Sequence, residues 1–186
     1  MRKLVVAALA LGILVTMPVG ALQDQEPETF IGNAISTGGR SGTSRIQLRI
    51  DRWNTPEERQ AYLALLAEGG QEALVKQFQQ SEIGRARVGQ RNSYPISYAY
   101  QFVAEDGTRR VVIATDRPIG ALEAVGRAST MEWGVSIVEL RMPPEGNGEG
   151  ALVVAGAVVA NAETHTLSLE NYGQAPVRLS SVRSEK

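Results

Sequence analysis

Hydrophobic and polar residues alternate along much of the chain, with the period of two that is typical of half-buried β-strands. The clearest example is residues 44–53, where Ile46, Leu48 and Ile50 face one way and polar residues face the other. The alternating residues within 98–114 flank an Asp-Gly pair, which predicts a β-hairpin with a tight turn. Seven to nine short strands of this kind predict an antiparallel sheet, which closes as a barrel or packs as a sandwich, the barrel being preferred.

One segment, near residues 55–80, has helical rather than strand periodicity. Thr-Pro-Glu-Glu at residues 55–58 indicates a helix start, with Thr55 as the N-cap and Glu58 closing a capping box. A Gly-Gly pair at residues 69–70 predicts the end of this helix, and an apolar stripe resumes beyond it. We therefore expect a mainly β (α+β) fold with one inserted helical hairpin, whose apolar stripes pack on the core.

Further strands are expected towards the C-terminus. Residues 143–150, rich in Pro and Gly, predict a loop, and the apolar, Val-rich residues 151–160 predict one buried strand. Residues 171–173 are expected to turn the chain into a last strand at residues 176–182.

The N-terminal residues have the organisation of a bacterial-type secretory signal peptide. Two basic residues precede an apolar run at residues 4–16, and Val19 and Ala21 suit the small-residue pockets of a signal peptidase. The run is shorter than the ~20 residues needed to cross a bilayer, so cleavage after Ala21 is favoured over an uncleaved anchor. The sequence thus predicts a signal peptide at residues 1–21 and an exported protein, periplasmic or secreted.

Removing the predicted signal peptide from the 186 residues leaves enough chain for one domain with its own core. We expect a flexible leader at residues 22–29 and a single β-rich domain, carrying the helical hairpin, at residues 30–186. The chain has no cysteine, so its stability depends neither on disulfides nor on thiolate-bound metal ions.

The charge of the expected mature chain is small and mixed, because 17 basic and 20 acidic residues remain without Arg2 and Lys3. Such a balance gives no electrostatic reason to bind nucleic acid or an anionic membrane. The densest basic patch consists of Arg85, Arg87 and Arg91, and a solvated strand face is favoured there over a phosphate site. We expect no nucleic-acid partner and no stable membrane insertion after signal cleavage.

No group of residues indicates catalysis, a cofactor or a metal ion. The single histidine, His165, lies in an expected surface turn with nothing nearby to complete a metal site. No serine lies in the elbow motif that is typical of a hydrolase triad. The remaining acid–base candidates are carboxylates spread over separate elements, namely Asp51, Asp116, Glu123, Glu132 and Glu139.

Aromatic residues give the one pattern with a functional interpretation. Tyr94, Tyr98 and Tyr100 have the spacing of one strand face, where they either line a barrel mouth or fill the core. Asp116 and Arg117 follow a strand and can pair there, structurally or around a ligand. The candidate ligand-binding residues are therefore Tyr94, Tyr98, Tyr100, Trp133, Asp116 and Arg117.

Four segments of the chain are specific enough to be compared with known proteins: Ile50–Arg59, Glu68–Leu74, Val112–Gly120 and Glu170–Gly173. They resemble segments of a set of uncharacterised exported proteins from soil bacteria, notably the acidobacteria. The resemblance extends over most of the expected mature chain and implies a location in the bacterial envelope or outside the cell. It implies no activity and supplies no functional residues.

Three hypotheses for the function follow from these features. The first is a non-enzymatic module that binds a small apolar or amphipathic molecule, favoured by the strand-rich pattern and the tyrosines. The second is a structural or interaction protein of the cell envelope, whose partner is another envelope protein. A carboxylate-dependent hydrolase is the least favoured, because a glycosidase pair needs a defined separation across a cleft.

Overall fold

Ten strands and one helix make up the part of the protein that the computed structural model describes. The described residues are 26–36, 42–89, 92–119, 135–154, 157–161, 166–170 and 176–185. The elements, in chain order, are β1 (Glu28–Ser36), β2 (Gly42–Ile50), α1 (Pro56–Phe78), β3 (Gly84–Val88), β4 (Asn92–Val103), β5 (Arg109–Thr115), β6 (Ser136–Met142), β7 (Gly148–Val154), β8 (Ala157–Asn161), β9 (Thr166–Glu170) and β10 (Val177–Glu185).

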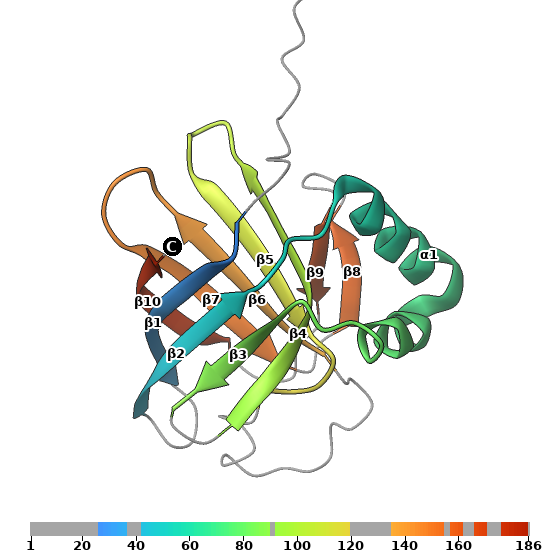
Figure 1. Cartoon of the computed structure of the whole chain (residues 1–186), viewed down its shortest axis with the longest axis horizontal. Helices are drawn as coiled ribbons and strands as arrows, with labels where there is room; N and C mark the ends of the chain where they lie inside the picture. Colours follow the sequence, from blue (N-terminus) through green and yellow to red (C-terminus); the bar gives the residue numbers. More distant parts are fainter. Residues whose placement is uncertain are drawn as a thin grey trace, which may run out of the picture.

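Eight of the strands form a closed antiparallel barrel, in the order β1-β10-β7-β6-β5-β4-β3-β2 (Figure 1). From β1 to β7 each strand pairs with the next one in sequence, and β10 closes the barrel by pairing with both β1 and β7. The remaining strands, β8 and β9, form a separate two-stranded sheet. Closure pairs each barrel strand on both sides, so the barrel has no open edge. The predicted mainly β, antiparallel fold is confirmed, and the barrel is the form it takes.

The barrel interior is filled by side chains from all eight of its strands. The predicted alternation of Ile46, Leu48 and Ile50 is confirmed, since they are at most 1% exposed and point into this core, but the strand ends at Ile50 instead of residue 53. An eight-stranded barrel is just wide enough for its side chains to fill it or for one small ligand, and here the inward-facing side chains are buried against one another. The inward-facing residues therefore form a hydrophobic core.

A second core lies outside the barrel wall, over β4, β5 and β6. Here α1 and the β8–β9 sheet cover the wall on one side of the molecule (Figure 1). Their apolar residues, among them Leu74 and Phe78 of α1 and Leu167 of β9, are fully buried against the outward-facing residues of the barrel. The wall beneath α1 and the β8–β9 sheet is therefore buried on both faces, whereas Glu139 and Arg141 in the second half of β6 are exposed.

The helix begins and breaks where the sequence predicts. The Thr55 side chain accepts a hydrogen bond from the Glu58 backbone N–H, and the Glu58 carboxylate accepts one from the Thr55 N–H, which completes the capping box. At Gly70 the backbone has φ 68° and ψ −172°, a conformation that a residue with a side chain rarely adopts. The break divides α1 into two segments that run in different directions (Figure 1), as expected for the predicted helical hairpin.

The prediction of a single strand at residues 151–160 is wrong. Residues 148–154 form β7 in the barrel, whereas residues 157–161 form β8 in the second sheet. Both halves are apolar because Leu152 points into the barrel and Val158 into the second core. A hydrophobic run does not show which of two cores each residue enters, and the described residues form ten strands instead of the predicted seven to nine. The connection expected at residues 121–130 and the turn at residues 171–173 lie outside the described residues.

The start of α1 is expected to weaken in acid through Glu58. Its carboxylate accepts hydrogen bonds from Arg52 Nη1 at 2.8 Å, Thr55 N at 3.0 Å and Asn54 Nδ2 at 3.1 Å. These donors, Arg52 first, lower the pKa of Glu58 below its ordinary value near 4.5. A lowered folded-state pKa means that the stabilisation is complete above pH ~5 and is lost as the pH falls through the folded pKa. We expect Glu58→Gln to cost about 1 kcal/mol at pH 7 and progressively less as the pH falls below 5.

Urea unfolding followed by circular dichroism at pH 7, 5, 4 and 3 measures this difference. Glu68→Gln, an exposed position on the same helix, is the control and should change stability little at any of these pH values. A Glu58→Gln cost that stays constant down to pH 3 would contradict the assignment of the acid sensitivity to this carboxylate.

Candidate functional site

The three candidate tyrosines of β4 do not share a face, contrary to the prediction. The pairing of β4 with β5 shifts between Ile96 and Tyr98, and this β-bulge at Ser97 reverses the alternation of the strand. Tyr94 therefore points into the barrel, whereas Tyr98 and Tyr100 point outwards, beneath α1. A bulge leaves no signature in the hydrophobic pattern, because the residues on both sides of it are apolar and buried.

Tyr98 and Tyr100 are packing residues of the second core. Tyr98 is fully buried, with its ring 5.7 Å from that of Tyr62 and 6.5 Å from that of Phe78. Its hydroxyl has no hydrogen-bond partner among the described residues, and burial raises its pKa. The Arg59 guanidinium lies 4.6 Å from the centre of the Tyr100 ring and covers it from the helix side.

Of the other candidate ligand-binding residues, Asp116 and Arg117 are described by the structure, whereas Trp133 lies outside the described residues. Asp116 and Arg117 do pair, through Arg117 Nε to Asp116 Oδ1 at 2.9 Å and Arg117 Nη2 to Asp116 Oδ2 at 2.8 Å. The Asp116 side chain is only 6% exposed, so the bidentate arginine satisfies a carboxylate at the exit of β5. This geometry is that of a structural ion pair.

A better candidate lies on the opposite side of the barrel, where β10 is irregular. The pairing of β10 shifts against both of its neighbours, β1 and β7, around Ser180 and Ser181. Ser181 is the only residue other than glycine with a positive φ, 53°, in the described part of the chain. On β1, a Cβ atom at Gly32 would lie 2.9 Å from Val182 Cγ2, so the strands can approach here only because Gly32 has no side chain.

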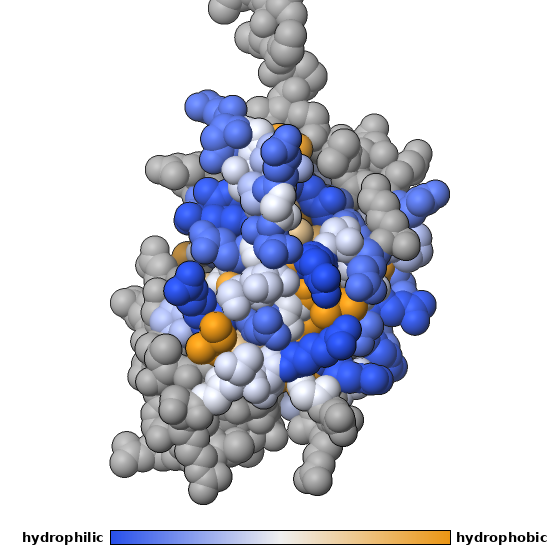
Figure 2. All heavy atoms as spheres, turned by 90° about the vertical axis from the view of Figure 1, so that its left-hand side faces the viewer, coloured by the Kyte–Doolittle hydropathy of each residue, from blue (hydrophilic) through white to orange (hydrophobic). Residues whose placement is uncertain are grey.

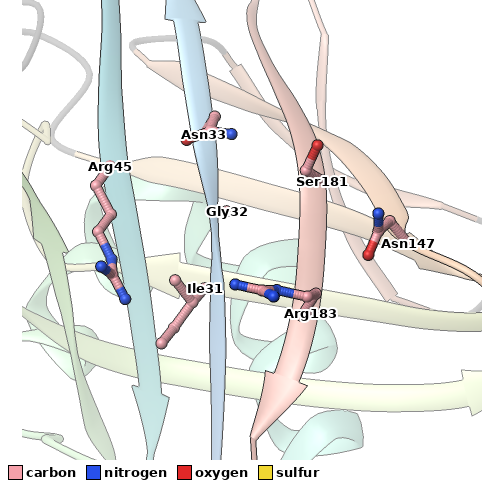
Figure 3. Close-up of a pocket in the computed structure, with 7 residues that line it drawn as sticks. All are labelled: Ile31, Gly32, Asn33, Arg45, Asn147, Ser181 and Arg183. Carbon is pink, nitrogen blue, oxygen red and sulfur yellow. The ribbon is translucent and has the colours of Figure 1, made fainter.

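A hollow of about 290 Å³ lies over this irregular pairing (Figure 3). It is lined by Ile31, Gly32, Asn33, Arg45, Asn147, Ser181 and Arg183. Strand pairing places Ile31 opposite Arg183, and Asn33 opposite Arg45. Figure 3 shows the two arginine side chains extending on either side of Ile31, from β2 and from β10.

The charges of Arg45 and Arg183 are not neutralised within the described part of the protein. Neither guanidinium forms an ion pair there, whereas Arg49 pairs with Asp51 at 2.8 Å and Arg85 with Glu82 at 2.6 Å. Guanidinium groups bind carboxylates and phosphates through paired N–H donors. Two of them beside amide side chains can therefore hold an anionic group.

A second hollow, of about 520 Å³, borders the first, since Asn147 and Arg183 line both. Its other lining residues include an apolar wall of Met142, Pro143 and Pro144. We call the two hollows together the bulge groove. It combines a cationic end at Arg45 and Arg183 with an apolar end at the β6–β7 connection.

Arg109 also lines the groove, but unlike Arg45 and Arg183 it has an ion-pair partner. Its Nη2 atom lies 2.7 Å from Oε1 of Glu28, which is 5% exposed, and the Ser184 hydroxyl donates to the same oxygen. The guanidinium also lies 5.2 Å from the centre of the Phe30 ring. Arg109 therefore closes this end of the barrel, and its charge is already balanced.

The acid–base and metal-binding candidates from the sequence are not brought together among the described residues. No three histidine, cysteine, aspartate or glutamate side chains gather there in a metal-binding arrangement. Asp51 pairs with Arg49, and Glu139 accepts a hydrogen bond from the Ser168 hydroxyl at 3.1 Å. His165, Glu123 and Glu132 lie outside the described residues. In the same described part, no helix is long and apolar enough to cross a bilayer.

Sequence reasoning missed the bulge groove for a physical reason. Its residues come from β1, β2, β10 and the β6–β7 connection, and only the closure of the barrel brings them together. Asn147 is followed by a glycine in a loop and indicates nothing more than a turn by itself. The solitary arginines Arg45 and Arg183 carry no motif that points to a shared site.

Comparison of the chain with protein-family models, with curated proteins and with solved structures gives no match.

Proposed function

We propose that the protein is a non-enzymatic binding module for an anionic amphiphile, held in the bulge groove. The observation that carries the proposal is the pair of guanidiniums, Arg45 and Arg183, which flank a hollow without an ion-pair partner among the described residues. An acid group between them would accept their N–H donors, and Asn33 and Asn147 can donate further hydrogen bonds from the rim.

The apolar part of the ligand would lie along Met142, Pro143 and Pro144 in the second hollow. The two hollows, of about 290 and 520 Å³, together have the size of a ligand site of about 300–1,000 Å³. Side chains occupy the barrel interior, so an amphipathic ligand would have to bind elsewhere, and the two hollows provide such a place. The binding site then lies on the outer surface and the rim.

Calorimetric titration with dodecyl phosphate below its micelle concentration tests the proposal. We expect Arg45→Gln and Arg183→Gln each to weaken binding about 10-fold or more, because a hydrogen bond to a charged group contributes about 1.5–3 kcal/mol. Ethyl phosphate should bind more weakly than dodecyl phosphate, because it cannot reach the apolar wall. Arg49→Gln, on the same strand as Arg45 but outside the groove, is the matched control and should bind normally.

Equal affinity for dodecyl phosphate and uncharged dodecyl maltoside would refute an anionic ligand. No binding of either compound would refute the binding module itself and leave the hypothesis of an envelope interaction protein.

A further inference from the structure

Exposed arginines are concentrated on the side of the barrel where the bulge groove opens. They lie on β2, β3 and β10 and point outwards, because the residues that alternate with them enter the barrel core. We call this set the arginine face: Arg45, Arg49, Arg85, Arg87, Arg178 and Arg183. Figure 2 shows the side of the molecule with β10, β1 and β2, whose described surface is mostly hydrophilic with small hydrophobic patches.

The strand register arranges these arginines in two dimensions. Across the strands, Arg87 is opposite Gln47, which in turn is opposite Ile31. Ile31 is opposite Arg183, so this row spans three strand intervals, or about 14 Å. Neighbouring rows hold Arg45 beside Asn33, and Arg85 beside Arg49. The cations therefore cover an area rather than follow a single line.

Three residues of the arginine face are partly neutralised where they lie, because Arg49, Arg85 and Arg178 pair with Asp51, Glu82 and Glu149. Arg45, Arg87 and Arg183 form no ion pair with a described residue, and the chain as a whole has a net charge of −1. The helix α1, on the other side of the barrel (Figure 1), carries more acidic than basic residues. Its acidic residues are Glu57, Glu58, Glu68 and Glu72, against Arg59 and Lys76. The charges thus form a dipole that would orient the protein at an anionic surface.

We infer that the arginine face docks onto an anionic lipid surface, from which the bulge groove takes its amphiphile. The inference rests on the proposed function, and two observations support it. The groove opens within the face, since Arg45 and Arg183 belong to both. A two-dimensional array of cations also fits a layer of lipid headgroups better than a single acidic polymer, which would follow one row.

Docking by this face is electrostatic and peripheral. The only large hydrophobic side chain that is exposed among the described residues is Val103, at the end of β4 and outside the arginine face. No apolar residue of the face is therefore available to insert among the acyl chains. Each basic residue near an anionic membrane strengthens binding about fivefold, and salt weakens the attraction.

Sedimentation with vesicles of phosphatidylglycerol and phosphatidylcholine tests this inference. The chain is used from Leu22 onwards, because all ten strands and α1 lie after this residue. We expect binding to these vesicles but not to pure phosphatidylcholine, and Arg85→Gln/Arg87→Gln should weaken it about 25-fold. Both arginines lie outside the bulge groove, so calorimetric binding of dodecyl phosphate should stay unchanged. Lys76→Gln, which removes an exposed cation from α1, should leave vesicle binding intact.

The outcomes separate the inference from the function on which it rests. Normal dodecyl phosphate binding with equal sedimentation on both kinds of vesicle would overturn the docking surface alone. Loss of dodecyl phosphate binding in the unmodified protein would overturn the proposed function, and with it the transfer from the lipid surface. Polygalacturonate, an acidic polysaccharide, is the competitor. If it releases the protein from vesicles and itself binds in a way that depends on Arg87, the arginine face binds acidic polysaccharides, and the inference of docking onto lipid is overturned.

Discussion

Replacing Phe78 with alanine is expected to lower the free energy of unfolding by about 3–5 kcal/mol. Phe78 is fully buried at the end of α1, with its ring 5.4 Å from that of Tyr62. Its backbone carbonyl accepts a hydrogen bond from the buried Ser97 hydroxyl at 2.8 Å, at the bulge of β4. The substitution therefore opens a cavity where the helix meets the barrel wall, in a core too closely packed to collapse around it.

Urea unfolding of the two proteins, followed by circular dichroism and by tryptophan fluorescence, measures the effect. Phe78→Leu fills most of the same volume and should cost less than about 1.5 kcal/mol. If α1 and the barrel form one cooperative unit, both probes will report the same transition in each variant. A Phe78→Ala protein in which the fluorescence transition is unchanged, and only the helical signal melts early, would show that α1 is an independently unfolding cover.

The two cores explain which parts of the fold could be predicted from the sequence. Where a strand is buried on one face only, as β2 is, alternation between Arg49 and its apolar neighbours identifies both the strand and its orientation. Where a strand lies between the two cores, as β4 does, the alternation of large apolar residues continues across the bulge at Ser97, although they enter different cores before and after it. The helix was predictable because its capping box and the break at Gly70 are local features, set by a few adjacent residues.

The candidate site could not be predicted, because it depends on contacts between distant parts of the chain. Arg45 and Arg183 meet only across β1, and the hollow between them follows from the irregular pairing of β10. The net charge was similarly uninformative, since it adds the acidic residues of α1 to the arginines of the opposite side. Composition describes the sum of the charges, whereas recognition depends on how the fold distributes them.

The arrangement of the cores also decides where a partner can bind. One side of the barrel is covered by α1 and the β8–β9 sheet, and its tyrosines are used for packing. The interior is filled by side chains of the barrel strands. The second core leaves the surface of β1, β2, β3 and β10 uncovered, and it is there that arginines without ion-pair partners among the described residues lie around a hollow. The proposed function therefore uses the side of the barrel that the second core leaves open.

Arg109→Met is expected to destabilise the protein by about 2–4 kcal/mol, because it leaves the buried carboxylate of Glu28 without its cation. Glu28 is 5% exposed, and the Arg109 side chain is 24% exposed, so the pair is screened from water on the Glu28 side in particular. The expected loss of stability is smaller than for a fully buried ion pair, because Arg109 retains some contact with solvent. Glu28→Gln should cost less, about 1–2 kcal/mol, since the Arg109 guanidinium can turn towards water and the amide still accepts from Ser184.

The double variant Glu28→Gln/Arg109→Met gives the coupling between the two groups, measured by urea unfolding. We expect it to be more stable than Arg109→Met alone, because the neutral amide that replaces the Glu28 carboxylate no longer needs a cation in the barrel end. The exposed pair Arg49–Asp51, with side chains 66% and 49% exposed, is the matched control and should show a coupling below about 1 kcal/mol. A coupling at Glu28–Arg109 as small as in this control would mean that Arg109 holds the barrel end by packing on Phe30 rather than by its charge.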